Sequence, residues 1–186
     1  MAPTIMIDSG HGGMDNGATY KGRKEKDDNL KIGLAVGERL EDAGYNVLYT
    51  RTTDVYDTPF QKAQKANNAG ADYFFSFHRN SSEVPNTYSG AQALVYSDNT
   101  RAAQIGENIM EQLVALGFKD LGVVERPGLV VLRRTNMPAV LLELGFINND
   151  ADNRIFDEQF NEMADAIVRG IEESIPLAPQ ARQYGV

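Results

Sequence analysis

The sequence contains no cysteine among its 186 residues. Disulfide bonds, thiolate metal sites and a cysteine nucleophile are therefore excluded. It also lacks any apolar run near the ~20 residues that a membrane span needs. The N-terminus shows neither the basic segment nor the apolar segment of a signal peptide. We therefore expect a protein that is made in the cytoplasm and has no membrane span.

Positive charge is in the minority, with 18 Lys and Arg against 26 Asp and Glu and a net charge of −8. Nucleic-acid-binding proteins need Lys and Arg clustered on one face, so nucleic acid is not an expected partner. The length suits one domain with a full core. We expect a monomer with one domain over residues 1–175 and a linker-like tail over residues 176–186, where little core-forming pattern remains.

Short apolar runs alternate with amphipathic stretches, a pattern that favours an α/β fold. The run at 72–77 is apolar on both faces and predicts a central strand, whereas 90–96 alternates and predicts an edge strand. Helical periodicity predicts a helix that starts near Asp27 or Asp28 and ends at Gly44. Three further helices are expected at 59–68, about 105–116 and 156–171, and the other strands at 4–8, 46–50, 129–133 and 139–143.

The chain holds only two histidines, His11 and His78, and each directly follows an apolar strand run. In open α/β sheets, ligands bind at the carboxyl ends of the strands. A lone histidine is usually structural, but two in the same kind of position at one edge could converge on a single ion. Glycines around His11 also allow the backbone to approach a ligand closely.

A catalytic zinc site needs three protein ligands and an open fourth position. Without cysteine, the third ligand must be a carboxylate, and Asp15 and Glu25 both follow His11 closely. Glu25 lies in a run of charges, which is usually a solvated surface. Composition and spacing leave the choice between the two carboxylates open.

Glu143 is the other unusual residue, because it lies within the apolar run 139–146. A carboxylate in such a run is costly to bury unless it is paired or functional. One interpretation is a buried ion pair with Arg133 or Arg134. The other is a general base whose pKa is raised beside a metal. The residues alone leave both interpretations open.

Four segments resemble, in order and at suitable spacing, the motifs of the zinc-dependent N-acetylmuramoyl-L-alanine amidases of family 3. They lie at residues 8–18, 24–30, 76–80 and 137–149, within a similarity that runs from about residue 3 to residue 174. The resemblance implies a mixed, twisted sheet of about six strands flanked by helices. It also implies that His11, Glu25 and His78 bind Zn²⁺ and that Glu143 is the catalytic base, which favours Glu25 over Asp15.

The implied reaction is hydrolysis of the amide between N-acetylmuramic acid and L-alanine in peptidoglycan, by water that zinc activates. The chain is similar to the catalytic part of a phage endolysin or autolysin, acting on the bacterial cell wall after release or export. A wall-binding domain is expected to follow Val186. The alternatives are another zinc peptidase that acts on wall peptides, or a catalytically silent wall-binding module.

Two residues depart from the family pattern: Ser9 replaces the usual proline of the first motif, and Arg79 follows His78 where a small residue is common. The change at Ser9 is expected to matter little. Arg79 is expected to place a cation beside the metal and so to alter substrate preference.

Overall fold

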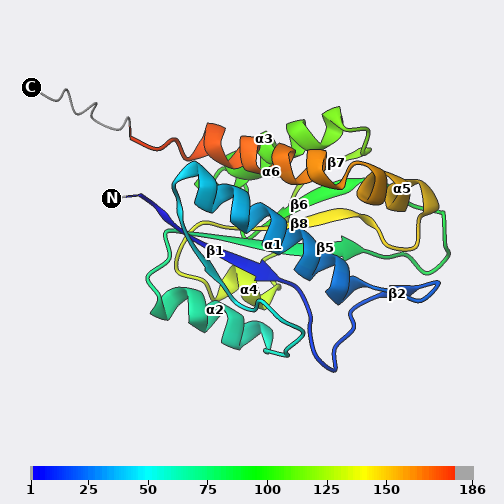
Figure 1. Ribbon diagram of the computed structural model, residues 1–186, viewed down its shortest axis with the longest axis horizontal. Coiled ribbons are helices and arrows are strands. Elements are labelled where there is room, and N and C mark those ends of the chain that lie inside the picture. Colours follow the sequence, from blue (N-terminus) through cyan, green and yellow to red (C-terminus); the bar gives the residue numbers. More distant parts are fainter. Residues whose placement is uncertain (1, 179–186) are drawn as a thin grey trace, which may run out of the picture.

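The structure is a computed structural model that describes residues 2–178. Within this part of the chain, six strands form one sheet in the order β4-β1-β5-β8-β6-β7. The strands β4, β1, β5 and β8 run parallel, whereas β6 runs antiparallel to β8. The expected mixed sheet is therefore confirmed (Figure 1). The strands are β1 (Thr4–Ser9), β4 (Asn46–Tyr49), β5 (Tyr73–Asn80), β6 (Ala91–Val95), β7 (Asp120–Glu125) and β8 (Ala139–Phe146).

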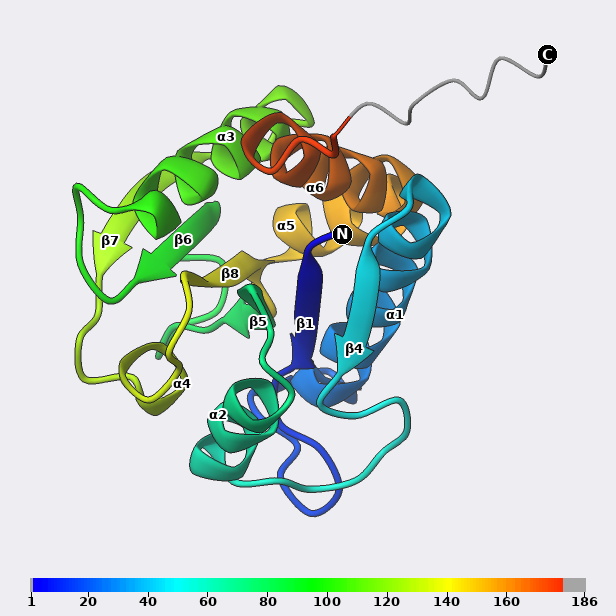
Figure 2. The same cartoon turned by 90° about the vertical axis from the view of Figure 1, so that its left-hand side faces the viewer.

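Helices cover both faces of this sheet (Figures 1 and 2). One face carries α1 (Glu25–Ala43), α3 (Arg101–Ala115) and α6 (Phe160–Ser174). The other carries the shorter helices α2 (Pro59–Asn68) and α4 (Val130–Arg133). The remaining elements are α5 (Asp150–Glu158) and a hairpin of β2 (Thr19–Tyr20) and β3 (Arg23–Lys24). Among the described residues, no helix has the length and apolar character needed to cross a membrane.

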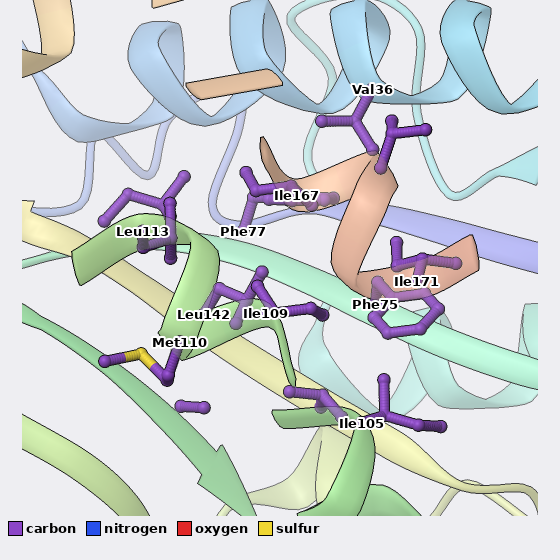
Figure 3. Packing of buried hydrophobic residues seen from close by; sticks show 14 of the residues in the cluster. Val36, Phe75, Phe77, Ile105, Ile109, Met110, Leu113, Leu142, Ile167 and Ile171 are labelled. Carbon is purple, nitrogen blue, oxygen red and sulfur yellow. The ribbon is translucent and has the colours of Figure 1, made fainter. Parts of the chain in front are cut away.

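The alternation of side chains along the strands separates two core layers. Phe75, Phe77 and Leu142 pack in the larger layer with α1, α3 and α6 (Figure 3). Phe74 and Leu141 belong to the smaller layer, on the face that α2 and α4 cover. By the same alternation, this second face ends in polar side chains near the carboxyl ends of the strands. They are Asp8 of β1, His78 of β5 and Glu143 of β8.

The strand predicted at 129–133 is wrong, since this segment forms the turn before α4 and α4 itself. Its apolar character comes from Val131 and Leu132, which pack on the smaller core layer. A short apolar run does not distinguish a strand from a buried helical turn. The sixth strand is instead β7, a partly exposed strand that begins and ends with exposed acidic residues and therefore carries a weak signal.

Three other predictions also fail in detail. β6 is not an edge strand, because β7 pairs with its outer side. The last helix is divided into α5 and α6 at Gln159, which leaves the helical conformation. The first helix begins at Glu25, before the predicted Asp27 or Asp28, and ends at a left-handed Gly44 as predicted.

The boundary predicted between the domain and the tail, at residues 175 and 176, lies near the end of the described residues. Tyr45 donates a hydrogen bond of 2.6 Å from its hydroxyl to the Ile175 carbonyl. Leu177, the second residue of the predicted tail, is partly buried against the core. Residues 179–186 of that tail lie outside the described residues.

Candidate metal centre

The two histidines meet at the carboxyl edge of the sheet, because β1 and β5 are parallel neighbours. The Gly10 N–H donates to the Phe77 carbonyl at 3.0 Å, which ties the loop after β1 to the end of β5. The rings of His11 and His78 then lie 5.0 Å apart between centroids, in an edge-to-face arrangement. The structure thus brings together the two histidines that the sequence placed at strand ends.

Glycine is required at two points of this arrangement. A Cβ atom on Gly10 would lie 2.3 Å from the His78 ring. A Cβ atom on Gly17 would lie 2.5 Å from a carboxylate oxygen of Glu25, and Gly17 also has a φ of +63°. Side chains at these positions would displace the imidazole or the carboxylate, so the glycine-rich loop is part of the site.

Glu25 is the first residue of α1 and supplies the third side chain of the cluster. Its Oε1 lies 3.2 Å from His11 Nε2 and 3.0 Å from His78 Nδ1. Its Oε2 accepts a hydrogen bond of 2.9 Å from the Ala18 N–H. One ligand atom from each of the three residues lies within 4.8 Å of the others, so this group could hold a metal ion.

Asp15, the other candidate carboxylate, lies outside the cluster. Its Oδ2 is 2.8 Å from His11 Nδ1, the ring nitrogen that faces away from Glu25. Its Oδ1 accepts a hydrogen bond of 3.0 Å from the Gly17 N–H, and 43% of its side chain remains exposed. The two carboxylates therefore differ in their contacts with the histidines. Glu25 faces both rings, whereas Asp15 contacts one ring, at the outer nitrogen of His11.

The electrostatics of the cluster favour positive charge. Burial lowers the pKa of His11, but the Glu25 and Asp15 carboxylates outweigh it and raise this pKa to about 9. Burial acts in the opposite sense on Glu25, yet hydrogen bonds and charge interactions with His11 and His78 hold its pKa well below 4.5. A site that stabilises a cation in this way, with two imidazoles and one carboxylate, fits the donor set of a divalent metal such as zinc.

Glu143 lies next to the cluster, because it pairs with His78 across β5 and β8. Its Oε2 is buried and has no hydrogen-bond partner within the described part of the chain. Burial raises the pKa of the Glu143 carboxyl above 4.5, outweighing the lowering effect of His78. Arg133 and Arg134 are exposed, and neither forms an ion pair with Glu143 among residues 2–178. The interpretation of Glu143 as a buried ion-pair partner of these arginines is therefore wrong.

A cleft of about 270 Å³ opens beside the two histidines on the face that carries α2 and α4. One wall comes from the segment before α2 and from Lys62, and the opposite wall comes from the turn before α4 and from α4 itself. The cleft joins a polar floor to mostly aliphatic walls. Its lining consists of Asp8, His11, Asp15, Asp57, Pro59, Lys62, His78, Gly128, Leu129, Val130, Val131 and Leu141.

Two buried cations, Arg51 and Lys62, fix the glycine loop, and neither had a predicted role. The Arg51 guanidinium donates to the carbonyls of Ser9, Gly10 and Lys26 at 2.8–3.0 Å. Lys62 donates to the Ser9 carbonyl at 2.6 Å and pairs with Asp8 at 2.9 Å. In the sequence, the ion pair between Lys62 and Asp8 could have been suspected from Asp8, because it is a carboxylate at the end of an apolar strand run.

The Arg79 guanidinium does not line the cleft beside the two histidines, so the contact through which it was expected to alter substrate preference is not present. The Arg79 side chain is fully buried between α1 and α5, where it pairs with Asp28 of α1 at 2.5 Å and donates a hydrogen bond to Asn153 of α5 at 2.6 Å. The guanidinium also lies 4.3 Å from the centroid of the Phe156 ring. Its backbone N–H donates to Glu25 Oε1 at 3.1 Å, so Arg79 contacts the cluster only through its main chain.

The fold and the cluster together define an α/β domain that carries, among the described residues, one candidate metal centre at the edge of a mixed sheet. A family model described as N-acetylmuramoyl-L-alanine amidase matches residues 5–173. The chain belongs to this family, and it is a hydrolase.

Relatives and solved structures agree with this assignment. The chain is 35% identical to the sporulation-specific N-acetylmuramoyl-L-alanine amidase of Bacillus subtilis over 93% of its length and 68% of the relative. It is also 35% identical to the endolysin of Bacillus phage SPP1, over 95% and 68% of the two chains. The crystal structure of an N-acetylmuramoyl-L-alanine amidase from Clostridium difficile 630 superposes with a TM-score of 0.87 and 33% identity, covering 92% and 96% of the chains.

Proposed function

We propose that this chain hydrolyses the amide between the lactyl group of N-acetylmuramic acid and L-alanine in bacterial peptidoglycan. The family model and the amidase and endolysin relatives support this substrate and this bond. The products are a lactyl carboxylic acid on the sugar and a free amino terminus on L-alanine. In the cell, the protein acts on the wall after release or export, as an endolysin or autolysin does.

His11, Glu25 and His78 would hold a zinc ion. The support is their mutual approach within 4.8 Å and a donor set that leaves zinc an open fourth position. The carboxylates of Glu25 and Asp15 add negative charge around His11. The chemistry that zinc supplies when bound is Lewis acidity, which polarises an amide carbonyl and acidifies water.

Glu143 would act as the general base. Its half-buried carboxylate lies beside His78, and this carboxylate would accept a proton from the water that attacks the amide carbonyl. The same carboxyl would then give the proton to the nitrogen of the leaving amine as the C–N bond breaks. The position of this carboxylate next to the histidines, with a buried Oε2 that has no hydrogen-bond partner among the described residues, is the observation that carries the mechanism.

The test is digestion of purified peptidoglycan by the purified chain, followed by identification of the new termini. Release of L-alanine amino termini is expected from the zinc-loaded protein. The Glu143→Gln variant with equal metal content serves as the matched control and should release almost none. If the wild-type protein released other amino termini, the enzyme would be a different wall peptidase, and if it released none, the chain would be a silent wall-binding module.

A further inference from the structure

Exposed apolar side chains gather on one side of the metal centre. Three of the nine large hydrophobic residues that are exposed in the described chain come from the two loops at 10–18 and 50–58 beside the cleft, and a fourth comes from the first turn of α2. We name these four residues the aromatic rim. They are Met14, Val55, Tyr56 and Phe60, with 86%, 48%, 42% and 48% of their surfaces exposed. Soluble proteins rarely concentrate exposed apolar surface without a binding role.

The rim is continuous with the cleft. Asp57 and Pro59 line the cleft with His11, and in the chain they lie between the rim residues Tyr56 and Phe60. Tyr56 packs over the glycine loop, where a Cβ atom on Gly13 would lie 3.0 Å from the Tyr56 Cβ. The two loops run side by side next to α2 (Figure 2). A molecule whose reacting bond lies at the histidines would therefore extend directly onto the rim.

Hydrogen bonds hold both loops in place. Asp54 Oδ1 accepts from the Gly13 N–H at 2.7 Å, and the Lys26 ammonium bonds both the Gly13 carbonyl and Asp54. Thr58 and Gln61 form a capping box at the start of α2, directly beside Phe60. The rings are thus presented on a fixed backbone, which reduces the ordering cost when a ligand binds.

The charges at the rim are paired with one another. Lys26 pairs with Asp54 at 2.6 Å, and Lys65 pairs with Asp57 at 2.6 Å. The surface beside the cleft therefore presents aromatic and aliphatic groups between neutralised pairs. A wall peptide carries free carboxylates and amines that require charged partners, whereas N-acetylated sugars are neutral and have apolar C–H faces. Aromatic rings combine apolar area with a polar edge and suit such faces.

We infer that the aromatic rim is the subsite for the glycan strand, where N-acetylated sugar rings stack on Tyr56 and Phe60. The inference rests on the proposed function, because it assumes that the scissile amide lies at the histidines. It assigns the peptide to the rest of the cleft, away from the rim. Selection for a sugar polymer is then built into the loop before α2, separately from the residues that carry out hydrolysis.

The first test measures binding of soluble, uncharged oligomers of N-acetylglucosamine to the wild-type chain by calorimetry, because glycan strands without their peptides would carry free lactyl carboxylates. The double variant Tyr56→Ala/Phe60→Ala should bind about tenfold more weakly, the scale expected for losing two stacked rings. Tyr96→Ala is the matched control, because Tyr96 is 51% exposed but lines a different cleft. The exchange variant Tyr56→Phe/Phe60→Tyr keeps both rings and should bind as the wild type does, which separates stacking from loop damage.

The second test compares substrates. For a polymeric glycan with intact peptides, the double alanine variant should show a KM raised about tenfold and an unchanged kcat. For a single N-acetylmuramoyl-peptide, both constants should change much less. Wild-type glycan binding by the double alanine variant would overturn the inference, and so would weakened binding of free wall peptide in place of glycan.

The glycan-binding measurement does not require hydrolysis. The outcomes for the glycan subsite and for the proposed amidase function can therefore be distinguished. If the wild-type chain bound the N-acetylglucosamine oligomer through the rim but released no L-alanine termini, the proposed function would fail and the glycan subsite would be supported. If the wild-type chain released those termini while the rim variants bound and hydrolysed polymer normally, the amidase function would stand and the glycan subsite would be refuted.

Discussion

His78 and Glu143 are direct neighbours on the parallel strands β5 and β8. Side chains alternate along a strand, so two residues paired in register point to the same face of the sheet. One supplies an imidazole to the candidate metal cluster, and the other brings a half-buried carboxylate whose Oε2 has no hydrogen-bond partner among the described residues. The register of a single strand pair therefore sets the relation between a candidate metal ligand and the proposed base.

Glu143→Gln should reduce peptidoglycan hydrolysis by at least ~10²-fold, because loss of a general acid–base usually costs this much. Metal content and thermal stability should change little, since no ion pair is broken. The exposed Glu111→Gln on α3 is the control and should retain full activity. A Gln variant that unfolds at much lower temperature yet cleaves normally would instead assign Glu143 a structural role.

Glu25→Gln should abolish stoichiometric zinc binding, since the amide is a weaker ligand than the carboxylate and the remaining side chains are the two imidazoles of His11 and His78. Atomic absorption should find about one zinc ion per wild-type chain and little in the variant. Glu38→Gln, an exposed change on the same helix, should keep its zinc. Full zinc occupancy after the change at Glu25 would remove it from the ligand set.

Much of the fold could be predicted because its signals are local. The strands β1, β5 and β8 are short apolar runs, and α1 ends at a glycine in the left-handed conformation. The segment 129–133 failed because apolar residues serve a buried helical turn and a buried strand equally. The strand β7 was missed because it forms an edge of the sheet and is only partly buried.

The candidate site likewise has residues that the sequence could predict and residues that it could not. His11 and His78 were recognisable from their positions after strands, but the choice between Asp15 and Glu25 depends on how the loop folds back onto α1. The buried position of Arg79 depends on Asn153, which is 74 residues away in the chain. No local pattern contains such a contact, and the position of Arg79 directly after His78 therefore predicted a cation beside the metal.

Asp15→Asn should weaken zinc binding by about 10–100-fold, the usual cost of losing a carboxylate that orients a histidine ligand. Asp15 contacts His11 Nδ1 and so leaves Nε2 directed at the cluster. Competition with a chromophoric chelator measures the affinity, with the exposed Asp27→Asn as the control. Equal affinity in the Asn variant would show that the glycine loop alone orients the ring.

Asp8 should make the stability of the domain depend on pH in the acid range. Burial would raise its pKa, but Lys62 and hydrogen bonds from Ser76 and Thr50 outweigh this and hold it below 3.8. A carboxyl whose pKa is lower in the folded state stabilises the fold above its unfolded pKa. This contribution is lost as the pH falls through 3.8 towards the folded value.

The measurement is urea unfolding of the metal-free protein between about pH 6 and pH 3, a range that brackets the ordinary pKa of Asp. Asp8→Asn alone leaves the Lys62 ammonium buried without its partner and should cost about 3–5 kcal/mol. The double variant Asp8→Asn/Lys62→Met removes both charges and provides a better folded reference. Its free energy of unfolding should fall less steeply than that of the wild type as the pH drops below 5, because other carboxyls titrate in both proteins and cancel in the comparison. Parallel curves for the two proteins would mean that the Asp8–Lys62 pair contributes no acid-dependent stability.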